Sequence, residues 1–144
     1  MSRTLILVVE DSEDDERLTL RALCGVSSPY RVKVAHDGSE AADMLGLGIV
    51  ANLNADRPAL VILDIQMPKL NGLDLLAMIR NSERMSPVTV IVFSSSCQQE
   101  DVDRAHLLHA EYQQKPMDYA DYLETVKRLV ENSLSGANSL ACAS

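Results

Sequence analysis

The chain has 144 residues, 47% of them hydrophobic, and a net charge of -8. This length suits a single domain with its own core, which must be aliphatic because the chain has one Phe and no Trp. The acidic balance argues against direct binding to nucleic acid, which requires positive charge to neutralise phosphates. Cys24, Cys97 and Cys142 have neither metal-ligand nor disulfide spacing, so they fit a reducing cytoplasm. The N-terminus lacks the apolar run of a signal peptide or membrane span.

Apolar and alternating stretches predict five strands, at Thr4–Val9, Tyr30–Ala35, Leu60–Leu63, Val88–Phe93 and Tyr112–Lys115. Stretches between and after them predict five helices: one from the N-cap Ser12 to Gly25, a short one capped by Ser39, then Gly72–Glu83, Gln98–His109 and Asp118–Asn132. Tyr30–Ala35 alternates, which is typical of an edge strand. Residues 49–57 form an insertion longer than a usual loop. This alternation predicts a doubly wound α/β fold, (βα)5, with a five-stranded parallel sheet over residues 1–132. Residues 133–144 are interpreted as a C-terminal tail with no separate output domain.

Polar side chains stand at four predicted strand ends. Glu10 and Asp11 follow the first strand, Asp64 follows the third, Ser94 the fourth, and Lys115 ends the fifth. The carboxyl edge of an open parallel sheet is where such folds bind ligands. Three carboxylates at close range repel one another unless a cation is present, and oxygen ligands of this kind suit Mg²⁺. We therefore expect a Mg²⁺ and phosphoryl site at this edge, with Lys115 supplying positive charge and Ser94 a hydroxyl group.

The acidic run continues past Asp11, from Glu13 to Glu16. A helix N-terminus favours acidic side chains because of its dipole. We interpret these four residues as stabilising and solubilising the first helix, with no part in the site.

The chain resembles the receiver domains of two-component response regulators from Thr4 to about Val130. The resemblance depends on V-V-E-D, V-I-L-D-I-Q-M-P-K-L-N-G, the serine after V-I-V-F, and Y-Q-Q-K-P. It implies a flavodoxin-like sheet of order 2-1-3-4-5 and a single-domain regulator phosphorylated by a sensor histidine kinase. The product would signal by protein contact or phosphorelay, without turnover as an enzyme.

The resemblance also implies roles for particular residues. Asp64 would be the phosphoacceptor, Asp11 would bind Mg²⁺ directly, Glu10 would bind it through water, and the backbone carbonyl of Gln66 would complete the protein ligands. Glu10 stands where aspartate is common in the family, but it keeps the carboxylate.

By the same resemblance, Ser94 and Lys115 would hold the phosphoryl oxygens. Tyr112 would be the aromatic switch that turns inward when Ser94 moves, although a strand aromatic there also has an ordinary packing role. Ser94 stands where threonine is common, but it keeps the hydroxyl group. The side chains of Gln66 and Ser96 would tune dephosphorylation.

A more limited resemblance is to the small regulators paired with bacterial phytochromes. It depends on the acidic start of the first helix, the insertion before Pro58 and the lack of an output domain. The partner would then be a bacteriophytochrome kinase. We also expect a homodimer through the fourth helix, fifth strand and fifth helix, with Tyr119, Tyr122, Leu134 and Leu140 nearby; the two tyrosines could instead complete the inward stripe of the helix.

Two other functions would also place an aspartate or an anion at this edge. A Mg²⁺-dependent aspartyl-phosphate phosphatase usually needs a second acid two residues after its nucleophile, where this chain has Gln66. A flavodoxin-like FMN carrier needs a phosphate-binding loop after the first strand, where this chain has E-D-S-E-D-D-E. Turnover of small phosphoesters, or a bound yellow flavin, would distinguish these functions from phosphoacceptance.

Overall fold

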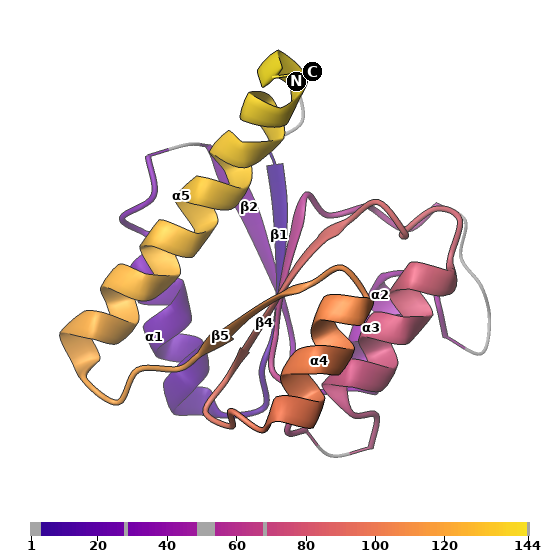
Figure 1. Cartoon of the computed structure of the whole chain (residues 1–144), viewed down its shortest axis with the longest axis horizontal. Coiled ribbons are helices and arrows are strands. Elements are labelled where there is room, and N and C mark those ends of the chain that lie inside the picture. The colour runs from indigo at the N-terminus through magenta and orange to yellow at the C-terminus, as the bar shows by residue number, and fades with distance from the viewer. Residues whose placement is uncertain (1–3, 28, 49–53, 68, 144) are drawn as a thin grey trace.

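A five-stranded parallel sheet forms the centre of the molecule (Figure 1). Its strands are β1 (Thr4–Val9), β2 (Tyr30–Ala35), β3 (Leu60–Leu63), β4 (Thr89–Ser94) and β5 (Glu111–Gln114). The computed structural model describes residues 4–27, 29–48, 54–67 and 69–143, with the backbone alone for residues 135–143. The strands run in the order β2-β1-β3-β4-β5, which confirms the predicted fold and the edge position of β2.

Five helices in the described part of the chain cover the two faces of the sheet. Their bounds are α1 (Glu13–Leu23), α2 (Gly38–Met44), α3 (Gly72–Asn81), α4 (Gln99–Leu107) and α5 (Tyr119–Ala143). Helices α1 and α5 lie together on one face, and α2, α3 and α4 lie on the other (Figure 1). Within the described residues, none of the helices combines the length and the apolar character needed to cross a membrane.

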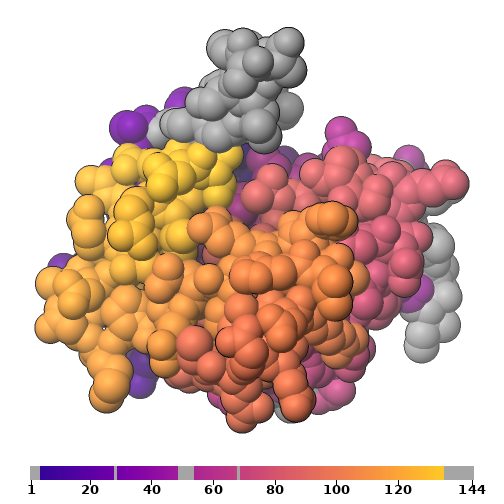
Figure 2. All heavy atoms as spheres, viewed as in Figure 1, coloured from indigo at the N-terminus to yellow at the C-terminus, as the bar shows by residue number. Residues whose placement is uncertain are grey.

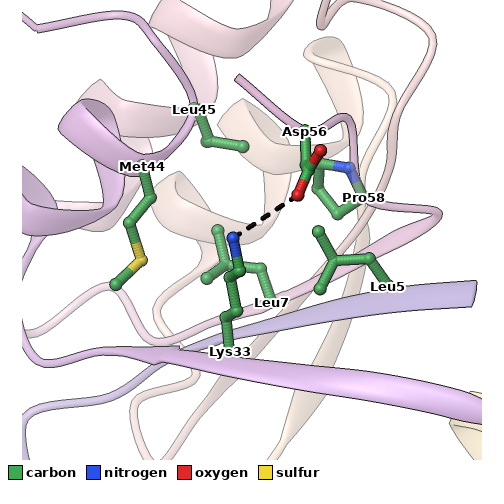
Figure 3. Close-up of a pocket in the computed structure, with 7 residues that line it drawn as sticks. All are labelled: Leu5, Leu7, Lys33, Met44, Leu45, Asp56 and Pro58. Atoms are coloured by element: carbon green, nitrogen blue, oxygen red, sulfur yellow. Dashed lines mark hydrogen bonds and ion pairs between the residues drawn. The ribbon is translucent and has the colours of Figure 1, made fainter. Parts of the chain in front are cut away.

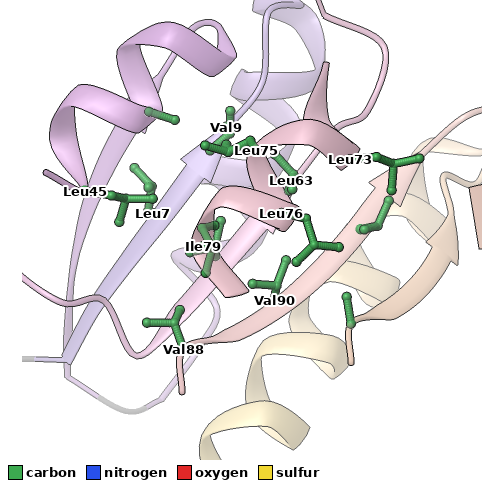
Figure 4. Close-up of a cluster of buried hydrophobic side chains, with 14 of the residues drawn as sticks. Leu7, Val9, Leu45, Leu63, Leu73, Leu75, Leu76, Ile79, Val88 and Val90 are labelled. Carbon is green, nitrogen blue, oxygen red and sulfur yellow. The ribbon is translucent and has the colours of Figure 1, made fainter. Parts of the chain in front are cut away.

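Two aliphatic clusters hold these layers together, because successive strand side chains point to opposite faces. Leu7 and Val9 of β1 point toward α2 and α3, where they join Leu63 and Ile79 (Figure 4). Ile6 and Val8 point the other way. The second cluster joins them to residues of β3, β4, α1 and α5, including Ile62, Phe93, Leu23, Tyr122 and Val126. All four residues of β3 are buried, as expected for a central parallel strand.

Local capping sets where three helices begin. The side chain of Ser12 accepts a hydrogen bond from the backbone N–H of Asp15, and Asn71 does the same for Leu73 at 2.7 Å. The predicted cap of α2 was wrong: Asp37, not Ser39, accepts from Glu40 at 2.8 Å, because the carboxylate lies at the extended residue before the first turn. A Cβ on Gly72 would lie 2.3 Å from the carbonyl oxygen of Asp64, so α3 starts in direct contact with the end of β3.

The predicted end of the last helix at Asn132 was also wrong. Helix α5 continues to Ala143, through most of the segment interpreted as a tail. Ala, Leu and Ser residues tolerate a helix, and extension of a helix that is already formed fixes only one residue for each new hydrogen bond. The division between domain and tail stays a prediction. Most of the predicted insertion, residues 49–53, lies outside the described residues.

Candidate functional site

The ends of four strands bring the predicted site residues together at one edge of the sheet. Glu10 follows β1, Asp64 follows β3, Ser94 is the last residue of β4, and Lys115 follows β5. Backbone hydrogen bonds extend the pairing past the strands: the N–H of Asp64 donates to Val9 O at 3.0 Å, and the N–H of Lys115 donates to Ser94 O at 2.8 Å. All four side chains are buried, with at most 8% of the residue exposed. The edge is therefore a built polar site within an otherwise apolar interior.

The Lys115 ammonium group is the centre of this site. Its Nζ lies 2.6 Å from Glu10 Oε2, 2.7 Å from Asp15 Oδ2 and 3.3 Å from Asp64 Oδ2. An ammonium group has three hydrogens, so these contacts use its full donor capacity. Asp64 Oδ1 also accepts a hydrogen bond from the backbone N–H of Gln66 at 3.2 Å.

Burial and charge shift the pKa values of two of these groups. Burial, together with repulsion from Asp64, raises the pKa of Glu10 to about 7, against the opposing effect of Lys115. Burial alone would lower the pKa of Lys115, but contacts with Asp15, Asp64 and Glu10 outweigh it and hold that pKa above its usual range. Lys115 is therefore charged at neutral pH, whereas Glu10 is close to its midpoint.

Three carboxylates of the site form a group suited to a divalent cation. Oxygens of Glu10, Asp11 and Asp64 all lie within 4.8 Å of one another. Glu10 and Asp64 are buried, while Asp11 is exposed and opens the group to solvent. Mg²⁺, Mn²⁺ and Ca²⁺ prefer hard oxygen ligands such as these carboxylates, whose negative charge exceeds the positive charge of Lys115. The residues present thus fit a divalent cation.

The other predicted residues surround this core. The side chain of Gln66 is exposed beside Asp64. Ser94 Oγ accepts a hydrogen bond from the backbone N–H of Ser96 at 3.2 Å. Tyr112 is half-buried, and its hydroxyl donates to the Ser96 carbonyl at 2.6 Å. Burial raises the pKa of Tyr112. A chain of contacts therefore connects Ser94 with Tyr112 through the loop after β4.

The interpretation of Asp15 as a solubilising residue was wrong. Its carboxylate is bonded to Lys115, 100 residues later in the chain. Asp15 lies in the first turn of α1, three residues after the cap residue Ser12, and its contact with Lys115 depends on how this turn packs beside the end of β5. Tyr122, considered for a contact surface, is 3% exposed and completes the inward stripe of α5. Its ring packs against Phe93 at 5.1 Å and its hydroxyl lies 3.1 Å from Thr19 Oγ1.

Hollows in the surface flank the site on two sides. One is lined by Asp11, Glu13, Glu16, Arg17 and His36, next to the acidic group. Another borders Lys115 and runs between α1 and the start of α5. A further, small pocket lies toward the other end of the sheet, where Lys33 and Asp56 pair at 3.5 Å above Leu5 and Leu7 (Figure 3). The first hollow thus includes Asp11 of the acidic group, and the second includes Lys115, so both border the site.

Comparisons with known proteins agree with this geometry. The family model of the response regulator receiver domain matches residues 6–127. The chain is 32% identical over 128 residues to the probable methanogenesis regulatory protein FilR2 of Methanothrix harundinacea, covering 88% of this chain and 81% of FilR2. It is 30% identical over 124 residues to response regulator Rcp1 of Synechocystis sp., covering 85% of this chain and 84% of Rcp1.

Solved structures give the same result in three dimensions. The crystal structure of phosphorylated RcpA, a cyanobacterial phytochrome response regulator, matches with a TM-score of 0.85 at 32% identity, covering 94% of this chain and 96% of RcpA. The Mn²⁺-bound form of Rcp1 matches with a TM-score of 0.80 at 29% identity, covering 88% of this chain and 91% of that one.

Proposed function

This chain belongs to the response regulator receiver domain family, and from that premise we propose that Asp64 accepts a phosphoryl group from a sensor histidine kinase in the presence of Mg²⁺. The observation that carries the proposal is the position of Asp64. It is a buried carboxylate grouped with Glu10 and Asp11 and in contact with a buried lysine. A carboxylate that serves only to cap a loop needs none of these neighbours.

In the proposed reaction an oxygen of Asp64 forms a bond to phosphorus. The bond from phosphorus to the donor's histidine nitrogen breaks, and its electron pair stays with the departing imidazole. Negative charge on the transferring oxygens is held by the Lys115 ammonium and by the Ser94 hydroxyl. Asp11, Asp64 and the Gln66 carbonyl would hold Mg²⁺ directly and Glu10 through water. The bound ion would supply charge neutralisation for the same oxygens.

We further propose that phosphorylation is relayed through Ser94 to Tyr112. In the structure Ser94 Oγ accepts the N–H of Ser96, whose carbonyl accepts the Tyr112 hydroxyl. A phosphoryl oxygen that attracts the Ser94 hydroxyl would disturb both contacts. Gln66 and Ser96 stand two residues after Asp64 and Ser94, with Gln66 exposed and Ser96 half-buried, so we assign both residues to the control of dephosphorylation.

The proposed partners follow from the same relatives. RcpA is a phytochrome response regulator, and we infer a bacteriophytochrome kinase as the donor for this chain. Exposed Cys24 and Cys97 are free thiols, which suits a reducing cytoplasm as the compartment. We propose that output is through protein contact, including a homodimer on α4, β5 and α5. Phosphatase turnover has less support, because Gln66 has no proton to transfer.

The test is phosphotransfer to the full chain from kinases loaded with labelled phosphate, one a bacteriophytochrome and one an unrelated histidine kinase. We expect faster transfer from the bacteriophytochrome, no transfer in excess EDTA, and no labelling of Asp64→Asn. Asp74→Asn is the matched control, since it loses one charge in an exposed pair with Arg104. Labelling of Asp64→Asn would contradict the phosphoacceptor assignment, and equal transfer from both kinases would contradict only the choice of partner.

A further inference from the structure

Asp15 contacts Lys115 but is not part of the acidic group of Glu10, Asp11 and Asp64. Glu10 and Asp64 both contact the ammonium, and both also belong to the set of carboxylates that would hold a cation. A cation bound by this set would therefore compete with Lys115 for their oxygens. Asp15, at 2.7 Å from Nζ, lies outside that set. Of the three carboxylates that contact Lys115, Asp15 is the one outside the group that would hold a cation, so a bound cation would not compete for it.

The position of Asp15 is itself fixed by its surroundings. Its backbone N–H donates to the cap residue Ser12 at 3.3 Å, and its carbonyl accepts from the Tyr122 hydroxyl at 3.3 Å. Tyr122 is in turn held by Thr19 and by the ring of Phe93. Helix α1 thus presents the carboxylate to Lys115 from a packed junction with α5, and the side chain is 30% exposed on its outer side.

We propose that Asp15 is a positioning residue for phosphoryl transfer, which acts by aiming the Lys115 ammonium at Asp64. This inference rests on the proposed function of Asp64. With one hydrogen of Nζ fixed by Asp15, another points toward the Asp64 oxygens, 3.3 Å away, where the phosphoryl group arrives. An ammonium held in place stabilises the developing charge without reorganising during the reaction.

The first test compares Asp15→Asn with Asp14→Asn in the full chain, with acetyl phosphate and Mg²⁺. Asp14 is the exposed neighbour on α1 and loses the same charge. In this reaction an Asp64 oxygen forms a bond to the phosphorus of acetyl phosphate, and acetate leaves with the electron pair of the broken bond. We expect the maximal phosphorylation rate of Asp15→Asn to fall about tenfold, less than the 10²–10³ typical for loss of a direct donor. The half-saturating acetyl phosphate and the Mg²⁺ affinity should change less than about twofold, because Asp15 acts on the charge that develops during transfer.

The direction of the effect separates positioning from a general charge effect. Removing a negative charge would by itself favour the approach of the anionic phosphodonor and raise the rate. Asp15→Glu restores a carboxylate and should recover part of the lost rate. Urea midpoints show whether each variant is folded. If Asp15→Asn does not fold, Asp15→Glu takes its place, and its maximal phosphorylation rate should lie below that of Asp14→Asn.

A double-mutant cycle with Lys115→Met then asks whether Asp15 acts through the lysine. In the Lys115→Met chain, Asp15→Asn should cause no further loss. A further tenfold loss there would overturn the inference, and so would equal rates for Asp15→Asn and Asp14→Asn in the parent. Lack of phosphorylation of the parent, or label that survives Asp64→Asn, would overturn the proposed function and this inference with it.

Discussion

Four carboxylates and one ammonium leave the site with excess negative charge. Lys115 contacts Glu10, Asp15 and Asp64, and Asp11 adds a fourth acid to the group. The metal-free protein relieves this excess in part by retaining a proton, since the pKa of Glu10 is raised to about 7 by burial and by Asp64. Protonation of Glu10 and binding of a cation would thus each reduce the same repulsion between the carboxylates.

This raised pKa predicts how stability depends on pH when metal is removed. Between the ordinary value of 4.5 and about 7, folded Glu10 keeps a proton that the unfolded chain has released. The free energy of unfolding in EDTA therefore falls as the pH rises through this window, by roughly 1–3 kcal/mol. Urea midpoints at pH 5 and pH 7.5 measure this difference.

The comparison is with Glu10→Gln, which cannot titrate. In this variant most of the fall in the free energy of unfolding between pH 5 and pH 7.5 should disappear. The same fall in Glu10→Gln and in the parent would show that another group is responsible.

At the scale of elements, Arg80 connects the end of α3 to two other segments. Its guanidinium donates to the carbonyls of Leu108 and His109 after α4, and to those of Ser86 and Val88 before β4. Burial lowers the pKa of Arg80, and the four carbonyls offset that cost by accepting its N–H groups. The planar guanidinium group of arginine can donate to several carbonyls at once, whereas the ammonium group of lysine lacks this fixed fork of donors.

We expect Arg80→Ala to lower the free energy of unfolding by about 2–3 kcal/mol, because it leaves carbonyls without their charged donor. Arg80→Lys should lose an intermediate amount, since it keeps the charge without the fork. Arg128→Ala, on the exposed side of α5, is the control and should change stability by less than about 0.5 kcal/mol. Urea unfolding of the three variants measures this, and equal midpoints for Arg80→Ala and Arg128→Ala would contradict the role of Arg80.

Elements whose signal is local could be predicted from the sequence. β1, β2 and β3 have the predicted bounds, because unbroken or alternating apolar runs end at polar residues. Glu10, Asp64, Ser94 and Lys115 converge as expected, because parallel strands place their carboxyl ends at one edge. The contact of Asp15 with Lys115 could not be predicted in the same way, since it depends on how α1 packs beside the end of β5. The extension of α5 was missed because small residues suit both a helix and a frayed end.

At the scale of the whole molecule, α4, β5 and α5 form one continuous face (Figures 1 and 2). Leu107, at the end of α4, is 78% exposed, whereas the large apolar side chains of the core clusters are buried. Tyr119, at the start of α5, is 49% exposed, with the Arg21 guanidinium 5.9 Å from its ring centre. The backbone of helix α5 continues beyond the core residues Leu129 and Val130 to Ala143. A face with an exposed leucine suits the symmetric use of one patch twice.

The proposed homodimer predicts a mass by light scattering of roughly twice 15.8 kDa for the full chain at high micromolar concentration. Leu107→Lys should weaken it because a charge replaces an apolar contact, while lysine at the end of α4 suits the helix dipole. Asn81→Lys is the control, because Asn81 is exposed at the end of α3, outside α4, β5 and α5, and gains the same charge. A chain ending at Leu134 keeps the packed part of α5 and tests the extension.

Phosphorylation should shift the dimer affinity by a coupling of about 1–3 kcal/mol, through Ser94 and Tyr112. A monomer in every case, with and without phosphorylation, would rule out the dimer and leave contact with another protein as the route of output.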